Sequence, residues 1–401
     1  MANFTSPAGV DTFTRVMAGV YDENEIVSNQ TGFLSFFDGS GQSETLFSES
    51  RDVVDIDIMR TPDLALAPMV IRGTPGLPVS GVKDVSGVKF SSFAMKYPLI
   101  YQPGSISAEQ LNQRRPGESA DSGAARIDRC HWYAKKIIDK IVVNHSRTWE
   151  YLAAQSITTG SMPAIIGTTE TDLTYDFLRK ATHTYAVATK WDDGASHAET
   201  DLDAAWTLIN RDSHMNAEML IMGSSAVPAL QNNFGIKALY DYRRADFIKY
   251  GDNVELPTRF NKFVKGGMTF LGNLLTPLGH KIYCFSYDGG YTNSSGTWVP
   301  YIAAKKAVLC PAEVRCDRYF GPAATLPVDP AREQWYRFYF GMSPQLTAPV
   351  TVKNNSLIDP RAFHFDGYPS PDGTAVQVRV QSAPIFAPIQ TDAFVTMQVL
   401  A

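Results

Sequence analysis

One uninterrupted helix constrains the fold of this chain more than any other stretch of its sequence. Residues 124–154 contain neither proline nor glycine, and an apolar stripe recurs there at helical spacing. Asp121 and Ser122 are suitable N-caps, and Gly160 and Pro163 follow the end. Residues 121–156 are therefore predicted to form a helix whose unbroken part spans on the order of 45 Å, about the width of a domain.

The composition of the stripe indicates what this helix packs against. Its members are Ile127, Cys130, His131, Ala134, Ile137, Ile138, Ile141, His145, Thr148 and Leu152. A coiled coil requires Leu or Ile at most of these positions, whereas this stripe carries Cys, His and Thr. The helix is therefore predicted to lie on a sheet.

Residues 51–100 are predicted to form a long β-hairpin. Apolar and polar residues alternate over 54–59 and again over 88–93, and the Gly- and Pro-rich residues 72–78 between them favour a turn. A two-stranded ribbon buries too little apolar surface to be stable alone. Near the turn lie the apolar residues Leu64, Leu66, Met69, Val70, Ile71, Val82 and Val85. Another subunit is the expected cover for this surface, because such a patch is seldom left in water.

The segments on either side of these two elements differ in character. Residues 1–50 are expected to be an arm too small for a core of its own, whose Phe33, Phe36 and Phe37 pack on the rest of the fold or on another chain. Residues 165–340 alternate between helix and strand, with a helix predicted over 201–215 and a buried strand over 218–222. Other predicted strands cover 267–270, 280–285, 301–309, 375–380 and 393–400.

Charge and composition exclude several classes of protein. The 401 residues are 44% hydrophobic and 19% charged, as in a folded protein, and the net charge of −5 disfavours tight binding to nucleic acid. No run of about 18 apolar residues and no signal peptide is present, so a cytoplasmic product without a membrane segment is expected. The four cysteines lack CxxC spacing and are expected to be small buried thiols.

A search for catalytic, metal and cofactor motifs favours a protein that is not an enzyme. The sequence contains no phosphate-binding loop, dinucleotide turn, HExxH helix or nucleophile elbow. Cys130 and His131 are neighbours on a helix and point about 100° apart, so they are expected to be core residues and not a catalytic pair. Asp55 and Asp57 are expected on a solvated strand face, without metal. No catalytic, cofactor or metal residue is predicted.

The order of arm, hairpin, capped long helix, α/β insertion and closing β segment resembles the major capsid proteins of tailed bacteriophages, which have the α+β Hong Kong 97 fold. The resemblance is closest to the lambda-type major head protein family. It rests on residues 56–58 and 72–76, on Ile106-Ser107-Ala108-Glu109-Gln110-Leu111, and on residues 378–384 with Asp392-Ala393.

The resemblance implies a domain organisation. Residues 1–50 are the N-terminal arm, 51–100 the extended loop, 101–164 with 341–401 the peripheral domain including the spine helix 121–156, and 165–340 the axial domain. Residues 1–50 are shorter than the helical scaffolding segment of some members, which implies a separate scaffold protein.

The resemblance also implies a function and its partners. The chain is expected to assemble with itself into pentamers and hexamers of an icosahedral shell, found in the virion and assembled in the host cytoplasm. The shell is expected to bind a portal protein and to contact packaged double-stranded DNA weakly. The resemblance does not decide whether decoration proteins also bind. The predicted inter-subunit residues are Val70, Ile71, Arg72, Gly73, Pro75, Leu77, Phe33, Phe36, Phe37, Arg114, Arg115 and Glu118. The alternatives are an encapsulin-type nanocompartment shell and a hydrolase with an unrecognised site.

Overall fold

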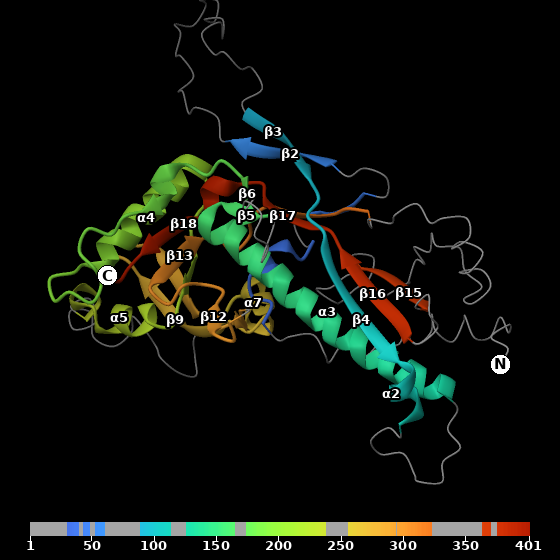
Figure 1. The fold of residues 1–401 in the computed structure, drawn as a ribbon. Coiled ribbons are helices and arrows are strands. Elements are labelled where there is room, and N and C mark those ends of the chain that lie inside the picture. The colour runs from blue at the N-terminus through green and yellow to red at the C-terminus, as the bar shows by residue number, and fades with distance from the viewer. Residues whose placement is uncertain are drawn as a thin grey trace, which may run out of the picture.

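A computed structural model of the chain gives an elongated molecule built around one long helix. It describes residues 30–39, 43–48, 53–60, 89–113, 126–164, 174–237, 256–293, 295–322, 363–369 and 375–401. Figure 1 shows the helix, α3 (Arg126–Thr159), running from a mixed sheet at one end of the molecule to the short helix α2 (Ala108–Asn112) at the other. None of the helices in these ranges is long and apolar enough to cross a membrane.

Helix α3 confirms the predicted spine over most of its length. It has 34 residues, which corresponds to a length of about 51 Å. The helix ends three residues later than predicted, where Gly160 takes a left-handed backbone with φ of 75° and donates its N–H to the carbonyl of Ser156 at 3.2 Å. Residues 121–125, the predicted start, lie outside the described ranges.

The buried face of α3 is broader than the predicted stripe. Ile138, Ile141, His145 and Leu152 are buried as expected, and Thr148 is half-buried. The structure adds Trp149, Glu150, Ala153 and Ile157 to the buried set. The side chains of Ile127, Cys130, His131 and Ala134 are not described. In the C-terminal half of α3, buried side chains therefore lie on more than one face of the helix.

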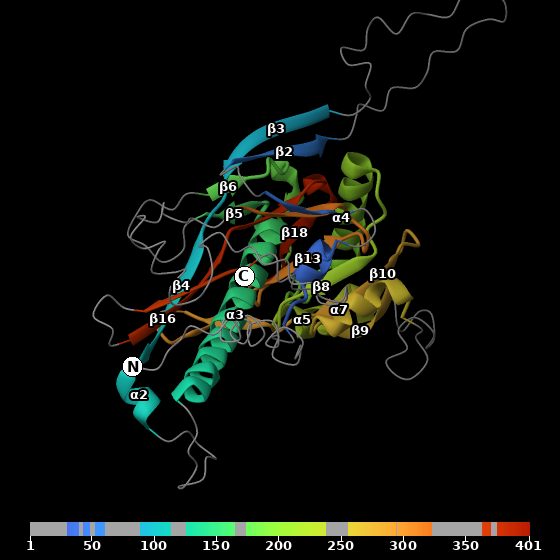
Figure 2. The same cartoon turned by 90° about the vertical axis from the view of Figure 1, so that its right-hand side faces the viewer.

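A three-stranded antiparallel sheet lies along α3, as the predicted helix-on-sheet packing requires. Its order is β15 (His364–Pro369), β16 (Ala375–Ser382) and β4 (Ile100–Ser107). Figures 1 and 2 both place β4 and β16 beside α3. The approach is close, because a Cβ added to Gly104 would lie 2.3 Å from Cγ2 of Ile137. The predicted N-cap Ser107 then starts α2 with a capping box, in which its hydroxyl accepts from the N–H of Gln110 at 3.2 Å.

A six-stranded mixed sheet forms the other end of the molecule. Its order is β7 (Thr184–Tyr185), β18 (Val395–Gln398), β13 (Lys306–Cys310), β8 (Met219–Met222), β10 (Lys281–Ser286) and β9 (Thr269–Leu275). Helix α4 (Ala198–Ser213) buries Leu202, Ala205 and Ile209 in the core of this region, confirming the predicted helix face. The shorter helices are α5 (Ala226–Asn232) and α7 (Asn261–Lys265).

The remaining elements are short. Strands β11 (Gly290–Thr292) and β12 (Trp298–Pro300) form a hairpin, and β5 (Ser161–Pro163) pairs with β6 (Thr174–Asp176). The short 3-10 helices are η2 (Leu34–Phe37), η3 (Ala181–His183), η4 (Thr258–Phe260) and η6 (Thr391–Ala393). Ser225 stands at the N-cap of α5, but its side chain accepts no capping hydrogen bond.

Two strands cross the predicted division between peripheral and axial domains. β18 was assigned with residues 341–401 to the peripheral domain, yet it lies inside the six-stranded sheet, where Val395 and Met397 are completely buried. β14 (Cys316–Phe320), assigned to the axial domain, forms a separate three-stranded sheet between β1 (Thr45–Phe47) and β17 (Pro384–Pro388). Both strands differ from the prediction because they pair with strands far away in the sequence. Periodicity within a strand does not reveal its pairing partner.

The base of the predicted hairpin is present and packs on its own subunit. β2 (Val53–Arg60) pairs antiparallel with β3 (Lys89–Lys96), with Ile56 opposite Phe93. Ile56 and Ile58 are completely buried, whereas Asp55 and Asp57 are exposed. At the base, therefore, the apolar face is covered without a second chain, contrary to our expectation for the whole hairpin. The predicted turn and its apolar residues fall in 61–88, outside the described ranges.

His145 provides a stability prediction. It is buried on α3 beside the ring of Phe363, and neither of its ring nitrogens has a hydrogen-bond partner among the described residues. Replacing His145 with Leu should therefore raise the free energy of unfolding at pH 7, by about 1 kcal/mol or more, because a buried unpaired polar group is costly. The measurement is urea denaturation followed by circular dichroism.

The same residue predicts a loss of stability in acid. Burial lowers the pKa of His145 from 6.5 to about 4, so the unfolded chain binds the proton more tightly than the folded one. The contribution of His145 to stability should fall as the pH drops from about 6.5 towards 4, so the stabilising effect of His145→Leu should be larger at pH 5 than at pH 7. An equal or smaller effect at pH 5 would contradict this assignment.

Candidate assembly interface

The predicted interface residues fall into two groups in the structure. Val70, Ile71, Arg72, Gly73, Pro75 and Leu77, together with Arg114, Arg115 and Glu118, lie outside the described ranges. Phe33, Phe36 and Phe37 are described, and their exposed fractions are 0%, 2% and 0% within a single chain. Their assignment to an inter-subunit interface is wrong for this conformation, because no surface of these rings remains for a second chain to cover. The other alternative, packing on the rest of the fold, is confirmed.

The three phenylalanines join parts of the chain that are far apart in sequence. The ring of Phe36 lies 4.6 Å from that of Phe263 in α7, and Phe37 lies 5.4 Å from Phe386 in β17. Phe33 meets Tyr287, just after β10, edge-on at 5.4 Å. The segment 30–39 therefore fills the space between the spine helix, the six-stranded sheet and the small sheet around β14.

A buried carboxylate on α3 holds the beginning of this segment. One oxygen of Glu150 accepts from the N–H of Phe33 at 2.7 Å, and the other accepts from the N–H of Leu34 at 2.9 Å. The hydroxyl of Tyr287 donates to the first oxygen at 2.7 Å. Glu150 is 0% exposed, and desolvation by burial, partly offset by these hydrogen bonds, raises its pKa from 4.5 to about 7.

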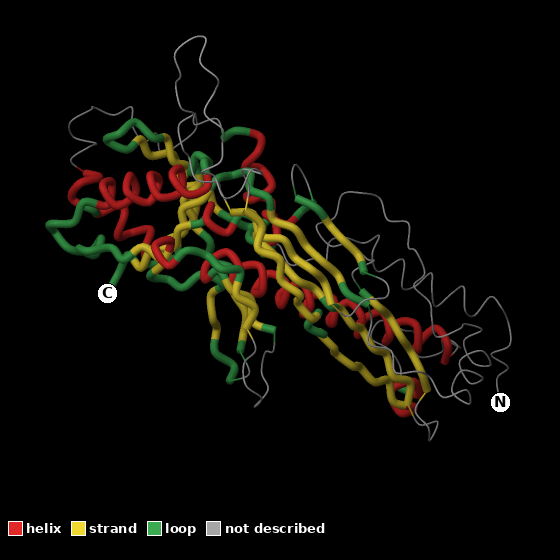
Figure 3. Tube along the Cα trace, turned by 90° about the horizontal axis from the view of Figure 1, so that it is seen from above, coloured by secondary structure: helices red, strands yellow, loops and turns green. Residues whose placement is uncertain are grey.

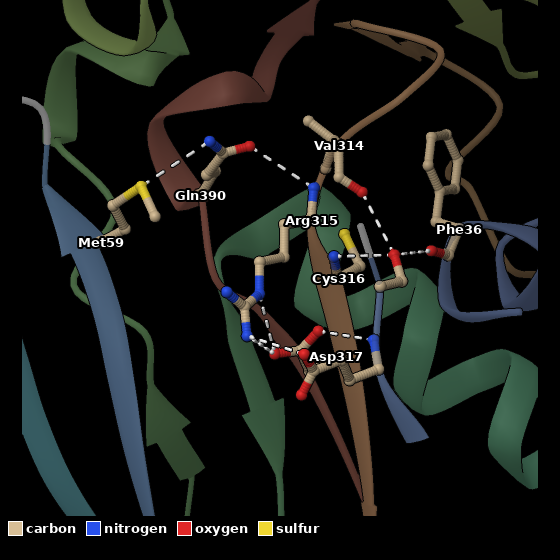
Figure 4. Close-up of polar contacts among 9 residues, drawn as sticks. Phe36, Met59, Val314, Arg315, Cys316, Asp317 and Gln390 are labelled. Carbon is tan, nitrogen blue, oxygen red and sulfur yellow. Dashed lines mark hydrogen bonds and ion pairs between the residues drawn. The ribbon is translucent and has the colours of Figure 1, made fainter. Parts of the chain in front are cut away.

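A second set of polar contacts holds the next part of the N-terminal segment to β14 (Figure 4). The hydroxyl of Ser43 accepts from the N–H of Cys316 at 3.2 Å and lies within reach of the carbonyls of Phe36 and Val314. Glu44 donates its N–H to Asp317, which is 1% exposed, at 2.8 Å. β1 follows directly and pairs parallel with β14. Hydrogen bonding thus continues from the segment into the sheet.

The base of the hairpin joins the same junction. Met59 in β2 donates its N–H to the carbonyl of Ile389 at 3.0 Å. The adjacent Gln390 accepts from the N–H of Arg315 at 3.4 Å and lies 3.8 Å from the sulfur of Met59, as Figure 4 shows. N-terminal segment, hairpin base and β14 are therefore linked to one another, and Figure 3 shows the strands gathered over the spine helix.

Exposed apolar side chains mark the described surface that another copy can still cover. They form one set near the hairpin base and the small sheets and another on the six-stranded end. The first set is Leu46, Val53, Leu99 and Tyr101, and the second is Phe234, Val264, Leu278 and Trp298. Leu278, in the turn between β9 and β10, is 67% exposed. Sequence reasoning missed all eight because single apolar residues in short elements carry no periodic signal.

The described residues give little indication of catalytic chemistry. Cys284, Cys310 and Cys316 are buried and free, as predicted, and burial raises the pKa of the Cys284 thiol to about 12. Such a thiol stays protonated and is a poor nucleophile. Within the described ranges, no three His, Cys, Asp or Glu side chains gather in a way that would hold a metal ion.

Comparison with known proteins places this fold among viral shell proteins. The sequence matches the family described as phage major capsid protein E over residues 47–332, which include the hairpin, α3 and most of the six-stranded sheet. The chain belongs to that family, and it is a phage major capsid protein. A search of curated proteins found no match.

A solved structure shares the fold. A protein described as a capsid protein of a prophage of E. coli CFT073 has a TM-score of 0.60 and 17% identity, covering 97% of this chain and 98% of that one. Together with the family match, this likeness confirms the predicted Hong Kong 97 fold. Lower similarity is found to the capsid of Ralstonia phage GP4, with a TM-score of 0.45, 11% identity and 92% and 91% covered. The SrpI encapsulin complex from Synechococcus elongatus PCC 7942 gives a TM-score of 0.40 and 8% identity, with 88% and 85% covered.

Proposed function

We propose that this capsid protein assembles into pentamers and hexamers that close into an icosahedral shell around double-stranded DNA. The observation that carries the proposal is the family match over residues 47–332, which spans the hairpin base and the spine helix. A closed shell needs one sequence to fit more than one environment, and closure requires contacts that repeat around symmetry axes. A long helix with strands projecting from it offers such contacts along its whole length.

The proposed contacts follow the sequence. Residues 51–100 are the extended loop, which reaches a neighbouring subunit through Val70, Ile71, Arg72, Gly73, Pro75 and Leu77. Arg114, Arg115 and Glu118 form a charged cluster at a further contact. The domain assignments also remain proposals: 1–50 is the arm, and 165–340 is the axial domain, now extended by β18. A separate scaffold protein and a portal are the proposed partners, and assembly takes place in the host cytoplasm.

The net charge of −5 supports weak contact with the packaged DNA. Binding that comes from neutralising phosphates requires a basic surface, and a shell that held DNA tightly would oppose its release. The role proposed for the chain is structural, as its family membership indicates.

Electron microscopy of the purified protein tests assembly directly. The expected result is rings or closed icosahedral shells, with light scattering showing particles much larger than one subunit. A compact monomer at every protein and salt concentration, also in the presence of its scaffold protein, would overturn the proposal. Shells that enclose a cellular protein and no phage components would favour a nanocompartment instead.

A further inference from the structure

The contact between Glu150 and the N-terminal segment has the properties of a switch. The segment 31–37 has no helix of its own long enough to be stable, since η2 has only four residues. The amides of Phe33 and Leu34, where η2 begins, are instead held by the two oxygens of Glu150 on the spine helix. A change in that side chain therefore acts directly on the backbone of the segment.

We propose that Glu150 is a proton-controlled latch, which holds residues 31–37 against the spine helix when protonated and loosens them when it loses its proton. The inference concerns the subunit itself and does not depend on the proposed assembly into pentamers and hexamers.

The geometry allows both protonation states while the segment is docked. As a carboxylate, Glu150 accepts from Phe33, Leu34 and the hydroxyl of Tyr287. As a carboxylic acid, it can direct its own proton to the Tyr287 oxygen, which also accepts weakly from the N–H of Gly32 at 3.4 Å. The two backbone donors keep an acceptor in either state. The states differ mainly in whether a charge is buried.

The groups around Glu150 do not neutralise that charge. Tyr287, just after β10, and Tyr301, just after β12, both have their pKa raised, chiefly by burial and then by the charge of Glu150. Arg147, one turn earlier on α3, is exposed and acts on Tyr301. At the far end of the segment, Asp38 pairs with Lys262 at 3.3 Å. None of the ion pairs among the described residues includes Glu150.

The direction of the effect follows from linkage. With the segment docked, the pKa of Glu150 is about 7, and with the segment released and the carboxyl in water it returns towards 4.5. Docking therefore takes up a proton between these values. The docked state is most favoured below pH 4.5, and it loses that advantage as the pH rises through 7. Above that pH, the released segment exposes Phe33, Phe36 and Phe37, which are now buried.

Hydrogen exchange read by mass spectrometry tests the latch on the full-length protein. The readout is the protection factor of peptides covering residues 31–37, which corrects for the intrinsic effect of pH on exchange. Between pH 5.5 and 8.5 the wild-type factor should fall by about tenfold or more, as a pKa change of this size implies. A peptide from α4, whose buried Leu202, Ala205 and Ile209 pack in a core separate from that of Phe33, Phe36 and Phe37, serves as the internal reference and should not change in parallel.

Two variants separate the latch from general loosening. Glu150→Gln cannot titrate, so its protection factor should be flat over the same range even if it is lower throughout. Tyr287→Phe removes a hydrogen-bond donor that stabilises the carboxylate, so the protection factor of this variant should fall at a higher pH than that of the wild type. A wild-type protection factor that does not change with pH would overturn the proposal. A protection factor that falls equally steeply with pH in Glu150→Gln would also overturn it. Should Glu150→Gln fail to fold, an unshifted midpoint in Tyr287→Phe would overturn it.

Discussion

Replacing Ile138 with aspartate is expected to abolish soluble, folded protein. Ile138 is 0% exposed near the middle of α3. An uncompensated charge at such a site costs about 3–5 kcal/mol, and the whole free energy of unfolding of a domain is about 5–15 kcal/mol. The two quantities are comparable. Because α3 contacts several sheets, the loss should spread through the subunit.

The measurement is the soluble yield followed by circular dichroism and urea denaturation. Lys140→Asp provides the matched control, since it places the same side chain two residues further along the same helix at an exposed position. The control should retain the wild-type spectrum and lose less than about 1 kcal/mol. If Ile138→Asp were as stable as the control, the buried face assigned to α3 would be wrong.

Replacing Val70 and Ile71 with aspartate should produce a folded subunit that forms no shells. These residues lie near the predicted turn of the extended loop, where a neighbouring copy is the proposed partner. Removing an apolar anchor from an interface typically costs more than about 2 kcal/mol, and a closed shell repeats that loss at every subunit. Assembly should therefore fail while the fold persists. Deleting residues 73–78 should have the same effect.

Circular dichroism for the fold and sedimentation for assembly, on the same preparation, distinguish the outcomes. The control is Ser80→Asp with Ser86→Asp, which adds the same two charges to the loop without removing apolar anchors. It should assemble normally. Intact shells from the Val70 and Ile71 variant would refute the role of the loop, and an unfolded variant would place these residues in the subunit's own core.

The sequence predicts which helices and strands form better than it predicts which of them pack against one another. Helix α3, the hairpin base, α4, β8 and β16 all follow from the sequence, because the periodicity or apolar run of each lies within one continuous stretch. β14 does not: all five of its residues are buried, among them Asp317 and Arg318, which pair with Arg315 and Thr45. An apolar pattern cannot identify a strand whose buried charges are satisfied by other segments.

The candidate site was predictable only in part, for a related reason. Phe33, Phe36 and Phe37 were recognised as residues that need a cover, but the covering residues Phe263, Tyr287 and Phe386 lie more than 200 positions away in the chain. Glu150 was not recognised, since a glutamate on a helix is normally solvated. Its role becomes visible only when two backbone amides from another segment are found against it.

The position of β18 within the large sheet affects how the chain folds during translation. The strand lies between β7 and β13, so residues 184–310 cannot complete their sheet until the ribosome has passed Gln398. At a translation rate of about 5–20 residues per second, the position between β7 and β13 stays unfilled for several seconds or more. Newly made subunits thus gain a finished sheet only after residues 395–398 have been made, which delays their encounter with other copies until this region has been translated.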